Sequence, residues 1–222
     1  MNRIAITGSF KTGKSTLSLV LSNLTGFQYI RPVTDYELRE KFINYNKELD
    51  QFYTHYLNCL FKLSNRLKNE SLAESCFISD GCILNEVAYL KAYHETSSCG
   101  LLGKGKVKEE QSLMILSIEN SVNNYFKGRY DRIIKLDTNN LIHGISESSL
   151  TFKRLYDTFL EEMLDKLGQP YRTYQVGDFE ATVHMIIKNE GFEYNMSVNE
   201  AMDKAKLNLP PLDSRIEIIE TY

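Results

Sequence analysis

The stretch that decides the fold reads Gly8-Ser9-Phe10-Lys11-Thr12-Gly13-Lys14-Ser15. It matches the spacing G-x-x-x-x-G-K-[ST] at every fixed position, and loops of this kind wrap a phosphate chain with inward-pointing backbone N–H groups. Gly8 and Gly13 allow the backbone to approach a ligand closely. The sequence therefore predicts a phosphate-binding loop over residues 8–15, and Thr16, which follows directly, is included in the predicted site.

The segments on either side of the loop support this interpretation. Residues 3–7 are, after Arg3, apolar or β-branched, as expected for a buried parallel strand. After the loop, apolar residues recur at helical spacing on one face, at Leu17, Val20, Leu21 and Leu24. A helix that begins near Lys14 would place the partial positive charge of its N-terminus at the loop. A chance glycine-rich turn would not need this order of strand, loop and helix.

The motif also assigns chemical roles. Lys14 would reach the β- and γ-phosphates of a nucleotide, and the Ser15 hydroxyl would ligate Mg²⁺. We therefore expect the chain to bind a nucleoside triphosphate, with ATP and Mg²⁺ as its cofactors.

Composition excludes several other classes. The 26 Lys and Arg residues against 29 Asp and Glu residues give a formal charge of −3, so nothing in the charge favours nucleic-acid or membrane partners. The four cysteines form no C-x-x-C pair, which is typical of reduced thiols. No apolar run approaches the ~18 residues of a membrane span, and no signal segment is visible. We expect a cytoplasmic protein with a small-molecule partner, and a homodimer remains open.

A second informative stretch ends a predicted strand in an acid and a glycine, Asp80 and Gly81, before a helical pattern resumes at Ile83. A carboxylate at a strand end can hold Mg²⁺ through water or accept the proton of an attacking hydroxyl. Asp80 could instead only cap the following helix. Because a phosphate loop needs an acidic partner for its metal, we favour a role for Asp80 in the site.

The segment after the second predicted strand leaves the sheet at the edge where ligands bind in such folds. Arg31 and Asp35 could face a substrate there, although Asp35 or Thr34 could also cap the next helix. A long helical pattern follows over residues 36–69. Its aromatic stripe is typical of core packing, and Tyr53 within it is a weaker candidate for substrate contact.

Two basic segments are candidates for contact with the transferred phosphoryl group. Residues 95–108 are rich in glycine and lysine and predict a surface loop, in which Lys104 or Lys106 could contact phosphate. Residues 138–154 predict a lid-like segment, with Lys153 and Arg154 placed to neutralise developing charge. In both places a solvated basic surface is the alternative.

The order of elements predicts an α/β fold with a doubly wound, mostly parallel five-stranded sheet and helices on both faces. Residues 1–190 would form one domain, and residues 191–222 a C-terminal extension docked on it. The predicted strands cover residues 3–7, 27–30, 75–80, 131–137 and 171–176. Gly26 is expected to end the first helix as its C-cap, and Asp178 to cap a helix that runs to about Lys188.

Three classes of protein share this plan. A GTPase needs the guanine-reading sequence N-K-x-D, whereas the nearest match, Asn46-Lys47-Glu48-Leu49, lacks the final Asp. A motor of the AAA type usually has paired acids at a strand end and further modules, whereas Gly81 follows Asp80 here. A small-molecule kinase needs only the loop, an acid near the acceptor and basic lid residues, and it fits best.

The chain resembles the P-loop kinases of nucleosides and nucleotides, particularly the ribosylnicotinamide-kinase-like group and the deoxynucleoside and thymidylate kinases. The resemblance rests on residues 4–24, 77–89 and 130–188. It implies transfer of the γ-phosphoryl group of Mg·ATP to a nucleoside or nucleoside monophosphate. Lys14, Asp80, Asp35 and Arg154 would be catalytic, and Arg31, Tyr53 and Lys153 would contact substrate.

Two departures from this group bear on the acceptor. These kinases often have Arg directly after the strand-three acid, where Gly81 stands, and deoxynucleoside kinases usually have Glu before the proline that follows strand two, where Arg31 stands. Asp80 or Asp35 would then have to act as the base, and Arg31 could bind an acidic acceptor such as a monophosphate. A nucleotide-binding regulator without transferase activity and a polynucleotide or modified-base kinase remain as alternatives.

Overall fold

The computed structural model describes residues 2–34, 37–38, 51–73, 75–98, 109–138 and 147–209. Its sheet consists of five strands, all parallel, in the order β2-β3-β1-β4-β5. The predicted doubly wound sheet is confirmed, and it is wholly parallel. The strands are β1 (Asn2–Thr7), β2 (Gln28–Ile30), β3 (Cys76–Asp80), β4 (Arg132–Asp137) and β5 (Arg172–Gln175).

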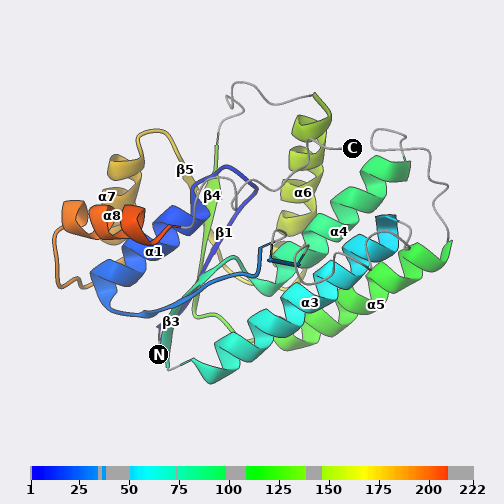
Figure 1. The fold of residues 1–222 in the computed structure, drawn as a ribbon, viewed down its shortest axis with the longest axis horizontal. Coiled ribbons are helices and arrows are strands. Elements are labelled where there is room, and N and C mark those ends of the chain that lie inside the picture. The colour runs from blue at the N-terminus through cyan, green and yellow to red at the C-terminus, as the bar shows by residue number, and fades with distance from the viewer. Residues whose placement is uncertain are drawn as a thin grey trace.

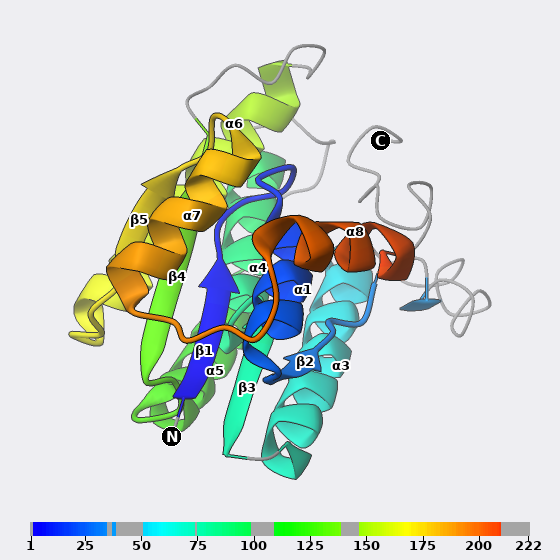
Figure 2. The same cartoon turned by 90° about the vertical axis from the view of Figure 1, so that its left-hand side faces the viewer.

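Helices cover both faces of the sheet (Figures 1 and 2). In Figure 1, the helices of one face stand to the left of β1 and β4: α1 (Lys14–Thr25), α7 (Phe179–Glu190) and α8 (Val198–Asn208). The helices to the right are α3 (Gln51–Leu72), α4 (Ile83–Ser98), α5 (Glu109–Phe126) and α6 (Glu147–Lys166). Among the described residues, no helix is long and apolar enough to cross a bilayer.

The side chains of the central strands alternate between two hydrophobic cores. On β1, Ala5 packs into the core beneath α3–α6, whereas Ile4 and Ile6 pack into the core beneath α1, α7 and α8. On β3, Phe77 and Ile78 divide in the same way. This alternation is what the two-residue period of a strand requires when both faces are covered, and it explains the near-continuous apolar sequences of these strands.

The structure corrects one boundary. The loop predicted over residues 95–108 begins too early, because α4 continues to Ser98. The Thr96 hydroxyl donates to the carbonyl oxygens of Ala92 at 2.8 Å and Tyr93 at 3.0 Å, so its polar group is satisfied within the helix and its side chain stays buried. Of the predicted helix over residues 36–69, the structure describes residues 37–38, which are helical, and α3 from Gln51, which ends at Leu72.

Helix α8 of the C-terminal segment packs against α1. Val198, Ala201 and Ala205 are buried in the same core as the apolar face of α1. The Asn23 side chain of α1 also donates to the Ala201 carbonyl at 3.1 Å. The small side chains of Ala201 and Ala205 allow the two helices to approach closely. Figure 2 shows α8 crossing the end of α1.

Candidate active site

The phosphate loop lies tightly against the end of β4. Gly8 has φ +127°, a region that L-residues rarely adopt, and a Cβ built on it would lie 2.2 Å from the carbonyl oxygen of Leu136. The Thr12 hydroxyl donates to the Ser9 carbonyl at 2.9 Å and closes the loop on itself. Contact with β4 therefore helps to determine the loop conformation, together with the hydrogen bond within the loop.

The N-terminus of α1 is open. Gly13 precedes the helix with φ +84°, no side chain caps the first turn, and the first turn holds no acidic residue. By contrast, α7 is capped by Asp178, which accepts from the Ala181 N–H, and α8 by a capping box of Ser197 and Glu200. No capping side chain therefore competes with an anion for the N–H groups of the first turn and the positive end of the α1 dipole.

The loop side chains differ in their environments. Lys14 folds back so that its ammonium donates to the Ser9 carbonyl. The Ser9 hydroxyl is buried and has no hydrogen-bond partner within the described structure. Ser15 and Thr16 are half-buried in the first turn of α1, Phe10 packs against the core beneath α3–α6, and Lys11 is exposed.

Asp80 lies beside the base of the loop. It ends β3, where it is in register with Ile6 of β1, and the following Gly81 N–H donates to the Ile6 carbonyl at 2.8 Å. Its carboxylate is nearly buried and accepts from the Tyr29 hydroxyl at 3.1 Å through Oδ2. Burial and the Asp80 charge raise the pKa of Tyr29 far above its usual value, so this phenol remains a donor at neutral pH. Two strands thus bring Asp80 and the loop together.

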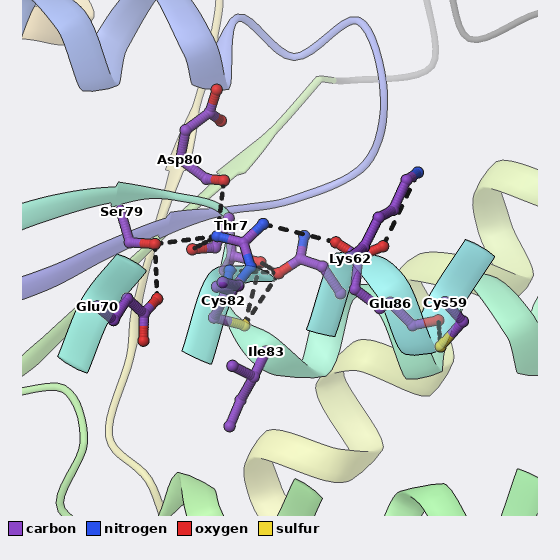
Figure 3. A network of polar contacts seen from close by, with 12 residues as sticks. Thr7, Cys59, Lys62, Glu70, Ser79, Asp80, Cys82, Ile83 and Glu86 are labelled. Atoms are coloured by element: carbon purple, nitrogen blue, oxygen red, sulfur yellow. Dashed lines mark hydrogen bonds and ion pairs between the residues drawn. The ribbon is translucent and has the colours of Figure 1, made fainter. Parts of the chain in front are cut away.

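A buried network lies beneath the turn between β3 and α4 (Figure 3). Arg66 of α3 donates to the Ser79 hydroxyl and to the carbonyl oxygens of Asp80 and Gly81, at 2.9, 2.9 and 3.0 Å. Its guanidinium also pairs with Glu86 at 3.5 Å. The Ser79 hydroxyl in turn donates to Glu70 at 2.8 Å.

Glu70 is the acidic centre of this network. Its carboxylate is buried and accepts from the Tyr130 hydroxyl at 2.8 Å and from Arg129 Nε at 2.5 Å. Burial, followed by the Glu70 charge, raises the pKa of Tyr130 well above its usual value. The network therefore ties α3 to β3 and to the turn before β4.

A second network joins the loop to the opposite helices. The Asn85 side-chain oxygen accepts from the Thr7 hydroxyl and from the Cys82 N–H, both at 2.8 Å, and its amide nitrogen donates to the Tyr156 hydroxyl at 2.5 Å. Burial raises the pKa of the Cys82 thiol to about 11, so it stays protonated at neutral pH. Asn85 of α4 thus connects β1, directly before Gly8, with α6.

Comparisons with known proteins support the fold. The described structure is similar to deoxyadenosine kinase from M. mycoides with bound dCTP, at 19% sequence identity and a TM-score of 0.58, covering 85% of this chain and 98% of that chain. The chain has the fold of the deoxyadenosine kinases. The same enzyme with bound dATP gives 17% identity and a TM-score of 0.59, with the same coverage. With products dCMP and a flexible dCDP bound, it gives 18% identity and 0.59, covering 85% and 97%.

Comparison of the sequence alone finds no relative. No protein-family model matches the chain, and no curated protein matches it. The resemblance that the motif and the element order indicated is therefore supported by the arrangement of the backbone.

On the acceptor side, the structure places Arg31 and Glu37 next to each other. Arg31 pairs with Glu37 at 3.0 Å. Glu37 also accepts from the Thr34 N–H at 2.8 Å, while the Thr34 hydroxyl accepts from the Glu37 N–H at 3.2 Å, so Thr34 begins the helical turn with a capping box. Asp35 lies outside the described residues.

The remaining predicted substrate residues lie in different surroundings. Tyr53 donates to Glu110 of α5 at 2.5 Å. Lys153 is almost fully buried and pairs with Asp157 at 2.9 Å and Asp137 at 3.8 Å. Arg154, one residue on, is exposed and has no partner in the part of the chain that the structure describes. Lys104, Lys106 and residues 139–146 of the predicted lid-like segment lie outside that part.

Sequence reasoning missed Arg66 and Glu70, although their positions contain a signal. The residues of α3 that are buried are Phe52, Cys59, Leu63, Arg66 and Glu70. Their spacing continues one helical face from apolar to charged residues. Two opposite charges that fall on the buried face of an amphipathic helix predict a buried ion network, because neither could be buried alone.

Proposed function

We propose that this protein is a kinase that transfers the γ-phosphoryl group of Mg·ATP to a hydroxyl group of a deoxynucleoside. The observation that carries this proposal is the open N-terminus of α1 at the end of a complete phosphate motif. The shared fold supports it. The chain covers 98% of a deoxyadenosine kinase that holds dATP, and 97% of the same enzyme with its products dCMP and dCDP bound.

The geometry of the loop and of Asp80 supports the following roles for the donor-side residues. The loop N–H groups and Lys14 would hold the β- and γ-phosphates, after the ammonium leaves the Ser9 carbonyl for a stronger anionic acceptor. Ser15 and Asp80 would hold Mg²⁺ directly or through water, because a hydroxyl and a carboxylate are hard oxygen donors that suit this ion. Bound Mg²⁺ would neutralise charge on the phosphates. The exposed Arg154 would approach the transferred group from α6.

The surroundings of Arg31 favour a neutral acceptor. Arg31 would suit a monophosphate if its charge were available, but the Glu37 carboxylate lies 3.0 Å from its guanidinium. A second anion would have to displace this carboxylate or share the cation with it. We therefore place nucleosides before nucleoside monophosphates as acceptors, with Asp80 or Asp35 as the base.

The proposal is tested by incubating the purified protein with Mg·ATP and each of the four deoxynucleosides and their monophosphates, and separating the products by anion exchange. We expect at least one deoxynucleoside to become a monophosphate, and Arg31→Ala to leave this activity largely intact. Lys14→Ala should remove nearly all transfer while leaving the fold unchanged, and Lys188→Ala, which removes an exposed lysine of α7, should have no effect.

Two other results would contradict the proposal. Tight ATP binding without phosphorylation of any nucleoside or nucleotide would indicate a nucleotide-binding regulator. Salt-sensitive binding of oligonucleotides together with their phosphorylation would indicate a polynucleotide kinase.

A further inference from the structure

The guanidinium of Arg66 lies directly beneath the turn that carries Asp80. The Arg66 side chain is only 4% exposed, and its Nη1 meets three acceptors on this turn: the Ser79 hydroxyl and the carbonyl oxygens of Asp80 and Gly81. A guanidinium is suited to this task, because its planar fork lets Nη1 meet the turn while Nη2 pairs with Glu86 at 3.5 Å. The carbonyl groups of two consecutive residues are thus held on the same side of the chain.

Gly81 leaves the space that the Arg66 guanidinium occupies. Its φ of +92° lies in the left-handed region, and a Cβ built on it would lie 2.9 Å from Arg66 Nη2. A side chain at position 81 would therefore meet the guanidinium, and the backbone conformation would be strained as well. The Arg66 guanidinium can lie beneath this turn because position 81 has no side chain.

This arrangement determines where the Asp80 side chain points. Figure 3 shows the Asp80 carboxylate pointing away from the side chains of Ser79 and Glu70, while its carbonyl oxygen lies on the side of the network. On the carboxylate side, the Tyr29 hydroxyl donates to Oδ2. Asp80 is therefore held at both ends, through its carbonyl group by Arg66 and through its carboxylate by Tyr29.

We propose that Arg66 is a positioning residue for Asp80: by holding the Asp80 and Gly81 carbonyl groups, it directs the Asp80 carboxylate toward the metal and phosphates at the loop. This inference rests on the proposed function. It assigns Arg66 no contact with substrate, since the guanidinium is buried and holds Ser79, Asp80, Gly81 and Glu86 of the protein itself. The competing interpretation is that Arg66 only stabilises the packing of α3 on β3.

The test compares Arg66→Met with Arg129→Met. Arg129 is a matched control because it is an arginine of the same network, which pairs with Glu70 and the Leu67 carbonyl but contacts neither Asp80 nor Gly81. Both variants should lower the melting temperature. Two further quantities separate them: the increase in ATP affinity that Mg²⁺ causes, measured by titration, and kcat for the best deoxynucleoside.

We expect Arg66→Met to bind ATP without Mg²⁺ as wild type does, to lose most of the Mg²⁺-dependent increase in affinity, and to lower kcat by about 10²-fold, the size of effect that a small displacement of a reacting group can have. Arg129→Met should retain both quantities. In the Asp80→Asn background, Arg66→Met should cost little further kcat, because the oriented carboxylate has already been removed.

The inference would be overturned if Arg66→Met and Arg129→Met changed the Mg²⁺-dependent ATP affinity and kcat equally. It would also be overturned if the losses of kcat from Arg66→Met and Asp80→Asn were additive, in free energy, in the double variant. If Arg66→Met does not fold, Arg66→Gln replaces it, because this shorter, uncharged side chain cannot place a nitrogen where Arg66 Nη1 meets the turn, and wild-type kcat in that variant would overturn the inference equally. If the wild type phosphorylates no nucleoside, the proposed function fails, while the Mg²⁺ titration still tests Arg66.

Discussion

Gly8 belongs to the phosphate-binding motif and also packs against β4 of the sheet. Its backbone lies so close to the Leu136 carbonyl that no Cβ fits, and its φ angle is one that glycine adopts without cost. The motif glycine is therefore required by the protein itself, before any nucleotide binds. This position should be sensitive to substitution even in measurements that involve no ligand.

Gly8→Ala should lower the free energy of unfolding by at least ~2 kcal/mol, from overpacking and backbone strain together. Urea denaturation measures this loss. Gly177→Ala is the control, because a Cβ there would meet nothing within 4 Å, and we expect it to change stability by less than ~0.5 kcal/mol. Equal stabilities of the two variants would show that the loop does not lie against β4 as described.

At this scale, the sequence predicted residues whose chemistry follows from a fixed spacing. The loop and Asp80 belong to this kind, because a motif and a strand end specify where they lie. The contacts of Arg66 and Tyr29 with Asp80 could not be predicted, because they depend on how α3 and β2 pack against β3. The pairing of Lys153 with Asp157 and Asp137 could not be predicted either, since Asp137 comes from another element.

Among the elements, α8 shows most clearly how packing follows from small residues. Ala201 and Ala205 are fully buried against α1, and α1 carries the phosphate loop at its N-terminus. We propose that residues 191–209 stabilise the position of α1 and so belong to the same folded unit as the phosphate loop. A larger side chain at this contact should then displace α1 and the phosphate loop at its N-terminus.

Ala201→Leu should destabilise the protein by about 1–3 kcal/mol, because the added atoms have no space between α8 and α1. Thermal unfolding measures this effect. Leu207→Ala on the same helix is the control, since Leu207 is 85% exposed and should change stability by less than ~0.5 kcal/mol. A fully stable Ala201→Leu variant would contradict the close packing of the two helices.

Element boundaries were predictable where turn chemistry marks them. The left-handed Gly26 at the end of α1 and the Asp178 cap of α7 both lie where their residue types indicate. The end of α4 was not predictable in this way. Its last residues are polar and resemble a loop in sequence, and the burial of Thr96 depends on the elements packed against it.

For the whole molecule, packing against the two cores buries Tyr130 and partly buries Tyr29. Tyr29 and Tyr130 are held protonated by burial and by nearby carboxylates, so the pKa of each is raised above its value in the unfolded chain. The stabilisation from such groups is fully present below pH ~10, the usual tyrosine pKa, and is lost as the pH rises above it, because the unfolded chain then releases protons that the folded chain retains.

The free energy of unfolding should therefore decrease above pH ~10, by up to about 1.4 kcal/mol per pH unit for each of the two tyrosines. Urea denaturation between pH 8 and pH 11 measures the slope. Tyr29→Phe should reduce it, since phenylalanine has no proton to release, and Tyr125→Phe should not, because Tyr125 is 62% exposed. A slope that is the same in wild type and Tyr29→Phe would contradict this account of Tyr29.

The existence of the sheet was predictable from the order of strands and helices, whereas the arrangement β2-β3-β1-β4-β5 results from contacts between strands far apart in the chain. That order places β3 and β4 on either side of β1, and so places Asp80 and Leu136 on either side of the phosphate loop. The candidate site is thus a property of the whole sheet.

The central claim is that residues 8–15 bind the phosphates of a nucleotide at the open end of α1. Equilibrium titration of Mg·ATP into wild type and Lys14→Ala tests it most directly, with the melting temperature measured in parallel. We predict saturable binding to the wild type and an affinity at least ~10-fold weaker for Lys14→Ala at an unchanged melting temperature, since a hydrogen bond to a charged group contributes about 1.5–3 kcal/mol. Equal affinities in the two proteins, or no binding to the wild type, would contradict the claim.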